Sequence, residues 1–483
     1  MIVTCVNHPF RFDVENLVRA FFPFEKIAAD GERSIVVETV FSEKTIHVFV
    51  KIFDKQAEET IALPEEDQDL ALCVLLYRLL TETTGIRGKW GILTGVRPAK
   101  LMHKLIGQLG ESAALAYFSD KLLVSEQKSR LTRRVAEAEN RIIALSGEDS
   151  FSLYISIPFC PTRCSYCSFV SHSVQSAKNL IDPYVELLVR EISETGRIAE
   201  DLGLRLETVY FGGGTPTTLS APQLEQIMTA VERCFDFSSL REYTVEGGRP
   251  DTITPEKLHV LRAHGAGRIS INPQSFSDNV LKAIGRNHSS QQTLEAYAMA
   301  RDAGFENINM DFIAGLPEDT REGFRDSIDR AVSLGADSIT VHTLAMKRAA
   351  FLVTEDLIHT VRGVDAVTDM VNYSNEKLTE SGYFPYYMYR QSKSAGNLEN
   401  VGWSRKDKEC LYNVYMMDET HTVLAAGAGA VTKLRSPYEN HIERIYNYKY
   451  PFEYIRDFDE MINRKAGISA FYETERRKHA ERS

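Results

Sequence analysis

The chain has 483 residues, 43% of them hydrophobic, which is long enough for two or three globular domains. Its formal net charge of -11 argues against a general nucleic-acid binder. No apolar run approaches the roughly 20 residues that a membrane-spanning helix needs, so no membrane span is expected.

The first residues and the cysteine content indicate a cytoplasmic protein. The N-terminal stretch lacks a basic region followed by an apolar segment and a small-residue cleavage site, so a secretory signal is not expected. Seven cysteines, an odd number with three of them clustered, do not resemble a disulfide framework. We therefore expect thiols that stay reduced and can act as metal ligands.

Residues 1–146 are expected to form a small α/β domain. Strands are predicted at 34–40 and 45–53, and helices around 67–81 and 113–146. The residues of this region indicate no chemistry of their own. The stretch 94–100 fits a contact to the next domain or to a substrate about as well as it fits the first turn of a helix.

Between about residues 150 and 350, short apolar strands alternate with helical patterns. The first strand, 153–159, has period two, and a helix opened by Pro183 follows it at 182–200. Further strands are predicted at 207–211, 242–246, 268–272, 307–313 and 338–344, with helices between them. Consecutive strand–helix units of this kind require parallel pairing with right-handed crossovers, either in a doubly wound sheet or in a full or partial barrel.

Three cysteines follow the first of these strands at three- and two-residue spacings. Cys160, Cys164 and Cys167 can therefore surround one inorganic centre. They are one short of a complete Cys₄ shell, so a [4Fe-4S] cluster held here would leave one iron open for reaction. A structural zinc site is an alternative, but its fourth ligand would be His172, whose offset fits no familiar zinc pattern. Three unrelated buried cysteines are the other alternative.

More glycine and polar residues follow the remaining strands. They are Gly213, Gly214 and Thr215 after the second strand, Glu246 after the third, Gln274 after the fourth, Asp311 near the end of the fifth and His342 on the sixth. Because the carboxyl ends of parallel strands share one edge, these residues and the cysteine loop should meet there. Glycine backbone can approach a polar ligand closely, and a carboxylate at the end of an apolar strand needs a partner. A purely structural role explains each of these residues alone, whereas their occurrence together at one edge favours ligand binding.

The strand that contains Tyr154, the cysteine loop after it and the Gly212–Thr217 stretch together resemble the radical S-adenosylmethionine superfamily. The residues of these motifs are similar to those of the oxygen-independent coproporphyrinogen III oxidases, also called coproporphyrinogen dehydrogenases. Within that family, the stretches 91–100, 272–276, 386–391 and 396–402 resemble the HemZ-type branch. The resemblance covers nearly the whole chain.

The resemblance implies an α/β fold built on a partial (β/α)₆ barrel, with an N-terminal α/β domain and a C-terminal α+β lid domain. The expected boundaries are 1–146 for the N-terminal accessory domain, 147–350 for the barrel and 351–483 for the substrate-side domain.

The resemblance also implies the cofactors. Cys160, Cys164 and Cys167 would hold a [4Fe-4S] cluster and so be both metal ligands and catalytic residues. The open iron would bind S-adenosylmethionine, of which one or two molecules are expected, and an electron from the cluster would cleave it to methionine and a 5′-deoxyadenosyl radical. The electron would come from a donor such as flavodoxin or ferredoxin. The cofactor-binding residues implied by the family pattern are Tyr154, Gly213, Gly214, Thr215, Glu246, Gln274, Arg286 and Asp311.

The substrate implied is coproporphyrinogen III, in which two propionates become vinyl groups with loss of carbon dioxide, to give protoporphyrinogen IX in haem biosynthesis. Another tetrapyrrole is the alternative within the same chemistry. A flat macrocycle with four carboxylates calls for an aromatic slot rimmed by cations. The candidates are the aromatic run 383–389 and Arg390, Lys393, Trp403, Arg405, Lys433 and Arg435.

Two positions depart from the family pattern. The coproporphyrinogen dehydrogenases carry a further cysteine two places after the third one, where this chain has Phe169. The related haem chaperones carry a histidine–asparagine pair in the C-terminal part, where this chain has Tyr412 and Asn413. A haem-binding chaperone, with Cys410 or another side chain on the iron, is therefore an alternative to the enzyme. A binding protein that keeps the cluster only for stability is a third hypothesis.

Overall fold

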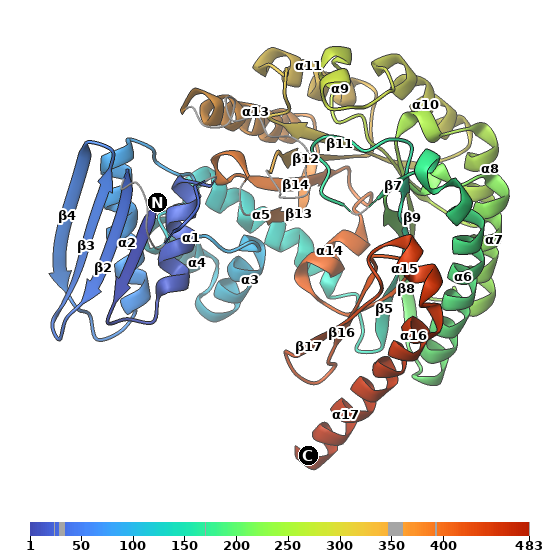
Figure 1. Cartoon of the computed structure of the whole chain (residues 1–483), viewed down its shortest axis with the longest axis horizontal. Coiled ribbons are helices and arrows are strands. Elements are labelled where there is room, and N and C mark those ends of the chain that lie inside the picture. The colour runs from blue at the N-terminus through green and yellow to red at the C-terminus, as the bar shows by residue number, and fades with distance from the viewer. Residues whose placement is uncertain (24, 29–33, 170, 346–360, 392–393, 483) are drawn as a thin grey trace.

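The computed structural model describes residues 1–23, 25–28, 34–169, 171–345, 361–391 and 394–482. In Figure 1 the N-terminal sheet and helices lie at one end of the molecule, and a large curved sheet with helices on its outer side fills the rest. No helix within the described ranges is both long and apolar enough to cross a bilayer.

The N-terminal region is a four-stranded sheet with two helices packed beside it. Its elements are β1 (Ile2–Val6), α1 (Arg11–Phe21), β2 (Ile35–Phe41), β3 (Thr45–Ile52), β4 (Lys55–Ala62) and α2 (Gln68–Thr84). Every second residue of β3 is buried, as expected for a strand that covers a core with one face. The two predicted strands and the first predicted helix are confirmed.

Three further helices connect this sheet to the rest of the chain. They are α3 (Pro98–Leu109), α4 (Glu111–Ala116) and α5 (Glu126–Ile143). The single helix predicted at 113–146 was wrong, because the chain leaves the helical path between α4 and α5, where Leu123 has a φ of 57°. The stretch 94–100 leads into α3, with Pro98 in its first turn.

The six predicted strand–helix units are confirmed as a parallel sheet. The strands are β5 (Ser150–Ile157), β8 (Arg205–Gly213), β9 (Glu242–Gly248), β10 (Arg268–Ile271), β11 (Asn307–Ala314) and β12 (Ser338–Thr343), which pair in chain order. The helices are α6 (Val174–Asp201), α7 (Ala221–Cys234), α8 (Pro255–Ala263), α9 (Asp278–Ala283), α10 (Ser290–Asp302) and α11 (Arg321–Ser333). This arrangement is the expected partial barrel.

The outer helices begin at side-chain caps. Ser220 and Ser289 form capping boxes with Gln223 and Gln292, which satisfy backbone amides in the first turns of α7 and α10. Helix α6 begins earlier than predicted, because the hydroxyl of Ser173 accepts a hydrogen bond from the amide of Ser176. Pro183 consequently lies inside α6 and does not open it.

The C-terminal region adds strands to both edges of the barrel sheet. Its elements are α13 (Val361–Glu380), β13 (Phe384–Arg390), β14 (Glu399–Ser404), α14 (Leu411–Asp418), β15 (Thr422–Ala426), β16 (Val431–Arg435), β17 (Ile442–Tyr446), α15 (Pro451–Arg456), α16 (Phe458–Arg464) and α17 (Ala466–Arg482). Strand β14 pairs antiparallel with β12 at one edge, and β15 pairs parallel with β5 at the other. The predicted boundary at 350 lies outside the described residues, and the three-domain division stays a prediction.

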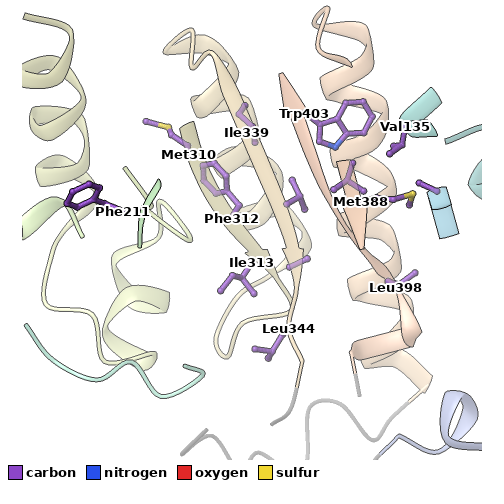
Figure 2. Packing of buried hydrophobic residues seen from close by; sticks show 14 of the residues in the cluster. Val135, Phe211, Met310, Phe312, Ile313, Ile339, Leu344, Met388, Leu398 and Trp403 are labelled. Atoms are coloured by element: carbon purple, nitrogen blue, oxygen red, sulfur yellow. The ribbon is translucent and has the colours of Figure 1, made fainter. Parts of the chain in front are cut away.

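One hydrophobic core runs through the barrel sheet and beyond it. Figure 2 shows Met310 and Phe312 of β11, Ile339 of β12 and Trp403 of β14, all of them buried. Val135 of α5 belongs to the same cluster, so a helix that follows the N-terminal sheet packs on the C-terminal edge of the barrel. The core therefore joins all three predicted regions.

A buried ion pair strengthens this junction. The Nζ of Lys128 on α5 lies 2.5 Å from Oε1 of Glu399 on β14, and neither side chain is exposed. The indole nitrogen of Trp90 donates a hydrogen bond of 2.9 Å to the other carboxylate oxygen. Burial would raise the pKa of Glu399, but the charge and hydrogen bond of Lys128 hold it below its ordinary value.

Candidate functional site

A cavity of about 380 Å³ lies at the carboxyl ends of the barrel strands. Its walls include every residue expected from the sequence to hold the cluster or the cofactor, namely Tyr154, Cys160, Cys164, Cys167, Gly213, Gly214, Thr215, Glu246, Gln274, Arg286 and Asp311. His342 and Phe169 also line it. The fold thus brings together residues that are spread over more than 180 positions of the chain.

The cysteine loop is held by hydrogen bonds from its surroundings. The amide of Ser165 donates to the carbonyl of Ile284 at 3.0 Å, and the hydroxyl of Thr215 donates to Sγ of Cys160 at 3.5 Å. Burial raises the pKa of the Cys160 and Cys167 thiols. A cation or metal centre at the loop would offset this cost and favour the thiolates.

The loop geometry does not match a preformed zinc site. Zinc–sulfur bonds of about 2.3 Å would draw the sulfurs of one tetrahedral site to within about 4 Å of each other. Across the described part of the chain, the three cysteines and His172 form no set of ligand atoms within 4.8 Å of one another. His172 instead makes ring contacts with Tyr450 and Phe452.

The glycine turn lies directly against the cysteine loop. A Cβ at position 214 would lie 2.5 Å from the carbonyl oxygen of Phe159 and 3.0 Å from Sγ of Cys160, so only glycine fits there. The amides of Gly214 and Thr215 donate to the carbonyls of Ile157 and Phe159. These two amides are therefore used by the fold, and the approach of a ligand to the turn stays a prediction.

Glu246 lies beside a stack of three tyrosines. The hydroxyl of Tyr210 donates a 2.5 Å hydrogen bond to Oε1 of Glu246. The Tyr210 ring stacks on Tyr412 at 4.4 Å between centroids and on Tyr154 at 6.2 Å. Burial raises the pKa of Glu246 to about 7, so this carboxyl holds a proton far more readily than an exposed glutamate.

We expect the stability of the unliganded protein to fall as the pH rises through this range. The folded protein holds the Glu246 proton up to about pH 7, whereas the unfolded chain releases it near pH 4.3, so the free energy of unfolding decreases between these values. Because Glu246 lines an open cavity, solvent screens its charge. We therefore expect a change in the free energy of unfolding of about 2 kcal/mol, which is less than the full pKa shift would give. Glu246→Gln should therefore be more stable than the unsubstituted protein at about pH 8 and similar to it at about pH 4. Urea denaturation at both pH values measures this, and an equal difference at both would contradict it.

Gln274 and Asp311 come from neighbouring strand ends and share backbone hydrogen bonds. The amide of Gln274 donates to the carbonyl of Asp311 at 2.9 Å, and this holds Gln274 at a φ of 69°. Its side-chain Oε1 is buried and has no partner among the described residues. A buried acceptor without a partner is costly in a folded protein, so it indicates a place for a ligand donor.

Asp311 has two neighbours that keep it ionised. The amide nitrogen of Asn309 donates to Oδ1 at 2.7 Å, and Nε2 of His342 lies 3.9 Å from Oδ2. Burial would raise the pKa of Asp311, but His342 and Asn309 hold it below its ordinary value. His342 is oriented in turn by a 3.2 Å hydrogen bond between its Nδ1 and the hydroxyl of Tyr389.

Arg286 is buried, whereas its sequence context alone resembles that of a surface arginine. Its guanidinium donates to the carbonyl of Asn272 and lies against Tyr166 and Cys164 of the cysteine loop. Its Nε has no hydrogen-bond partner within the described chain. A buried cation with an unused donor, next to the thiols, suits an anionic ligand.

Sequence reasoning missed Arg249, which positions the cysteine loop. It follows the glycines at the end of β9, is buried, and donates a 2.7 Å hydrogen bond to the hydroxyl of Thr162. It also pairs with Asp251 at 2.7 Å. Its place directly after a strand end was the signal that could have identified it.

Most of the predicted substrate cations do not reach the cavity. Arg390 is buried over the Trp90 ring and donates to carbonyls of the loop before α3, and burial lowers its pKa to about 9. Arg405 lies over the Tyr383 ring, Arg435 donates to nearby carbonyls, and Trp403 is in the core. Lys433 lies beside α14, and Lys393 is outside the described residues. From the aromatic run, Tyr387 and Tyr389 do line the cavity.

The candidate haem ligands are poorly placed to bind iron. Tyr412 is 5% exposed and lies within the tyrosine stack. Cys410 is fully buried, and its thiol donates to Oε1 of Glu242 at 3.2 Å. Both side chains are therefore committed to packing or hydrogen bonds within the fold.

Comparison with known proteins agrees with this geometry. Residues 154–331 match the Radical SAM superfamily. The chain is 35% identical over 472 residues to the oxygen-independent coproporphyrinogen-III oxidase-like protein HemZ of Bacillus subtilis (strain 168), covering 94% of each chain. It is 39% identical over 197 residues to the heme chaperone HemW of the same organism, which covers 41% of this chain and 51% of that relative.

A solved structure supports the fold. Coproporphyrinogen III oxidase (HemN) from Escherichia coli, described as a radical SAM enzyme, superimposes with a TM-score of 0.53. The match covers 68% of this chain and 73% of that chain at 24% identity, so it bears on the fold alone.

Proposed function

Because this chain belongs to the HemZ-type branch of the radical S-adenosylmethionine superfamily, whose members use a [4Fe-4S] cluster and S-adenosylmethionine, we propose that it converts propionates of coproporphyrinogen III to vinyl groups without oxygen. The observation that carries the proposal is the single cavity that joins the three cysteines to the glycine turn, two carboxylates and a buried arginine. The cytoplasm, with an electron donor such as flavodoxin or ferredoxin, suits this chemistry.

The residues present fit the cofactors. Cys160, Cys164 and Cys167 would hold the cluster, which leaves the shell one protein ligand short. The unpartnered Oε1 of Gln274 and Nε of Arg286 are a free acceptor and a free donor in the same cavity, as a ligand with both amino and carboxylate groups requires. When bound, the cluster and S-adenosylmethionine supply the electron and the hydrogen-abstracting radical.

The chain's own residues would bind and orient the reactants. Asp311, kept ionised by His342 and Asn309, would accept hydrogen bonds from ribose hydroxyls. Arg286 would bind the carboxylate of the methionine part through a charge-assisted hydrogen bond. Tyr154 and Tyr210 of the tyrosine stack line the cavity and would shield bound reactants from water on the side of β8.

One observation favours the enzyme over the haem chaperone, which is the other activity named among the relatives. The two side chains at the positions expected to bind haem iron, Tyr412 and Cys410, are both buried in contacts within the fold. The cavity, in contrast, is lined by the three cysteines and by the residues proposed to bind the cofactor.

The deciding experiment is an anaerobic turnover assay. Protein reconstituted with iron and sulfide, reduced, and supplied with S-adenosylmethionine and coproporphyrinogen III should form protoporphyrinogen IX, measured by mass spectrometry after oxidation of the products. The intermediate with one vinyl group should appear first. A protein that forms 5′-deoxyadenosine but leaves all four propionates intact would contradict the proposed substrate. Haem binding on titration without any decarboxylation would support the chaperone.

A further inference from the structure

Four basic side chains meet around one carboxylate beside the cavity. Oxygens of Glu419, the residue after α14, lie near the guanidinium of Arg97, 3.8 Å from Nζ of Lys100, 3.6 Å from Nζ of Lys433 and 3.0 Å from the guanidinium of Arg444. We call Arg97, Lys100, Lys433, Arg444 and Glu419 the Glu419 cluster. Its cations come from the start of α3 and from β16 and β17, the last two strands at one end of the large sheet.

The Glu419 cluster adjoins the cavity through α14. Asn413 and Met417 of this helix line the cavity, and the helix ends at Asp418. The Nζ of Lys433 donates to the carbonyl of Met416 at 3.1 Å, and Lys100 donates to the carbonyl of Asp418 at 2.8 Å. In Figure 1, α14 lies above the β16–β17 hairpin, and α3 lies to its left. The cations therefore lie at the end of a helix whose side chains form part of the cavity wall.

The Glu419 cluster carries more positive than negative charge. Four basic groups face Glu419, and Asp418 is the other carboxylate that acts at this end of α14. Glu139 is also close, and burial raises its pKa well above the ordinary value. Burial lowers the pKa of Lys433 to about 8, which still leaves it mostly charged.

The arrangement keeps the cations accessible. The side chains of Arg97, Lys100 and Arg444 are 31%, 42% and 41% exposed, while that of Glu419 is only 11% exposed. Glu419 has a φ of 63°, an uncommon conformation for a residue with a side chain, and it closes α14. A partly buried carboxylate thus holds several partly exposed cations side by side.

We propose that the Glu419 cluster binds carboxylates of the tetrapyrrole, namely the propionates that are not converted. This inference rests on the proposed function and deepens it. Two of the substrate's four propionates react. The enzyme must bind the other two in a fixed position, so that each reacting propionate can reach the cofactor in turn. The four cations outnumber the carboxylates around them, and an excess of positive charge next to the cavity suits carboxylate ligands.

The same site gives the stretch 91–100 a role. Arg97 and Lys100 are its two cations, and both contact the end of α14. The sequence left open whether this stretch binds substrate or only begins a helix. The structure assigns it both positions at once, at the start of α3 and within the Glu419 cluster.

The test uses coproporphyrin III, the oxidised and fluorescent form of the ring, as the probe. It is titrated into cluster-reconstituted protein without reductant, so that no turnover occurs. Arg444→Gln should weaken binding about tenfold, which corresponds to about 1.4 kcal/mol. Lys100→Gln should weaken it similarly, and added salt should reduce the difference between the variants and the unsubstituted protein.

Two controls make the result specific. Arg197→Gln removes an exposed arginine that pairs with Glu194 and Asp201 on α6, and it should leave the dissociation constant unchanged. A tetracationic porphyrin of similar size tests stacking alone and should not bind measurably. Circular dichroism confirms that each variant is folded.

The outcomes separate this inference from the proposed function. Normal coproporphyrin III binding by both Arg444→Gln and Lys100→Gln, equal binding of the cationic porphyrin, or no binding at all would overturn the inference, whatever the turnover assay shows. Binding that depends on Arg444, in a protein that forms no protoporphyrinogen, would support the Glu419 cluster as a carboxylate site and overturn the proposed reaction.

Discussion

Cys160→Ala is expected to abolish both the iron–sulfur chromophore and the formation of 5′-deoxyadenosine. The cysteine loop offers three sulfurs. Removal of the Cys160 sulfur leaves two, which are too few to hold the cluster. Loss of a residue that only supports a metal ligand costs about 10–100-fold in metal affinity, so loss of a ligand itself should cost at least about 100-fold in activity.

The measurement combines iron quantitation, the visible absorption spectrum and chromatography of the nucleoside product, all under anaerobic conditions. Cys5→Ala is the matched control, because Cys5 is also a free cysteine and lies in the N-terminal sheet, outside the cavity. It should keep full cluster content. If Cys160→Ala retained the chromophore and still cleaved S-adenosylmethionine, the assignment of the cysteine loop as the cluster site would be wrong.

Lys128→Met is expected to lower the free energy of unfolding by about 3–5 kcal/mol, because it leaves the charge of Glu399 buried without its partner. Trp90 supplies one remaining hydrogen bond, and the amide of Asn375 supplies a longer one at 3.4 Å. Neither carries a positive charge, so neither replaces the ammonium group.

A second substitution tests the cause of this loss. Lys128→Met combined with Glu399→Gln removes both charges, and it should recover most of the stability, because a neutral amide costs much less to bury than a carboxylate. Arg130→Met on the same helix is the control. Arg130 pairs with Glu126 at the surface, and its loss should change stability by less than about 1 kcal/mol.

Chemical denaturation followed by fluorescence and by circular dichroism measures these variants. A loss confined to the transition of the N-terminal region would indicate that the ion pair mainly attaches α5 to the barrel. If Lys128→Met alone were as stable as the unsubstituted protein, Glu399 would have to be uncharged in the fold.

The barrel and the cavity were largely predictable from the sequence, for a local reason. Each strand has its own apolar pattern, and a polar residue directly after a strand can be recognised without knowing where that strand lies in the sheet. The rule that parallel strands present their carboxyl ends together then placed Glu246, Gln274 and Asp311 beside the cysteine loop, as the cavity walls show. Their roles in binding the cofactor stay predictions.

The direction of individual side chains was not predictable. Arg390 follows an aromatic run and was expected at a substrate, but it is buried against Trp90, which is some 300 positions earlier in the chain. Nothing in its neighbourhood in the sequence identifies this partner. Arg286 is the opposite case, since only the family pattern distinguished it from a surface arginine.

The predicted ends of some helices were wrong for a similar reason. Ser173 caps α6 six residues after Cys167, where the apolar pattern is weak, whereas Pro183 is the stronger start signal in the sequence and lies inside the helix. The break between α4 and α5 depends on a single residue, Leu123, whose left-handed conformation no periodicity reveals.

The pairing of C-terminal strands with both edges of the barrel has a consequence for how the protein is made. Until β14 and β15 leave the ribosome, β12 and β5 remain edge strands with unpaired backbone groups, which readily pair with other chains. The barrel strands emerge well before these partners, since β15 begins at Thr422. During synthesis the nascent chain is therefore open to aggregation for most of its length, and a product truncated after β12 would keep both of these strand edges exposed.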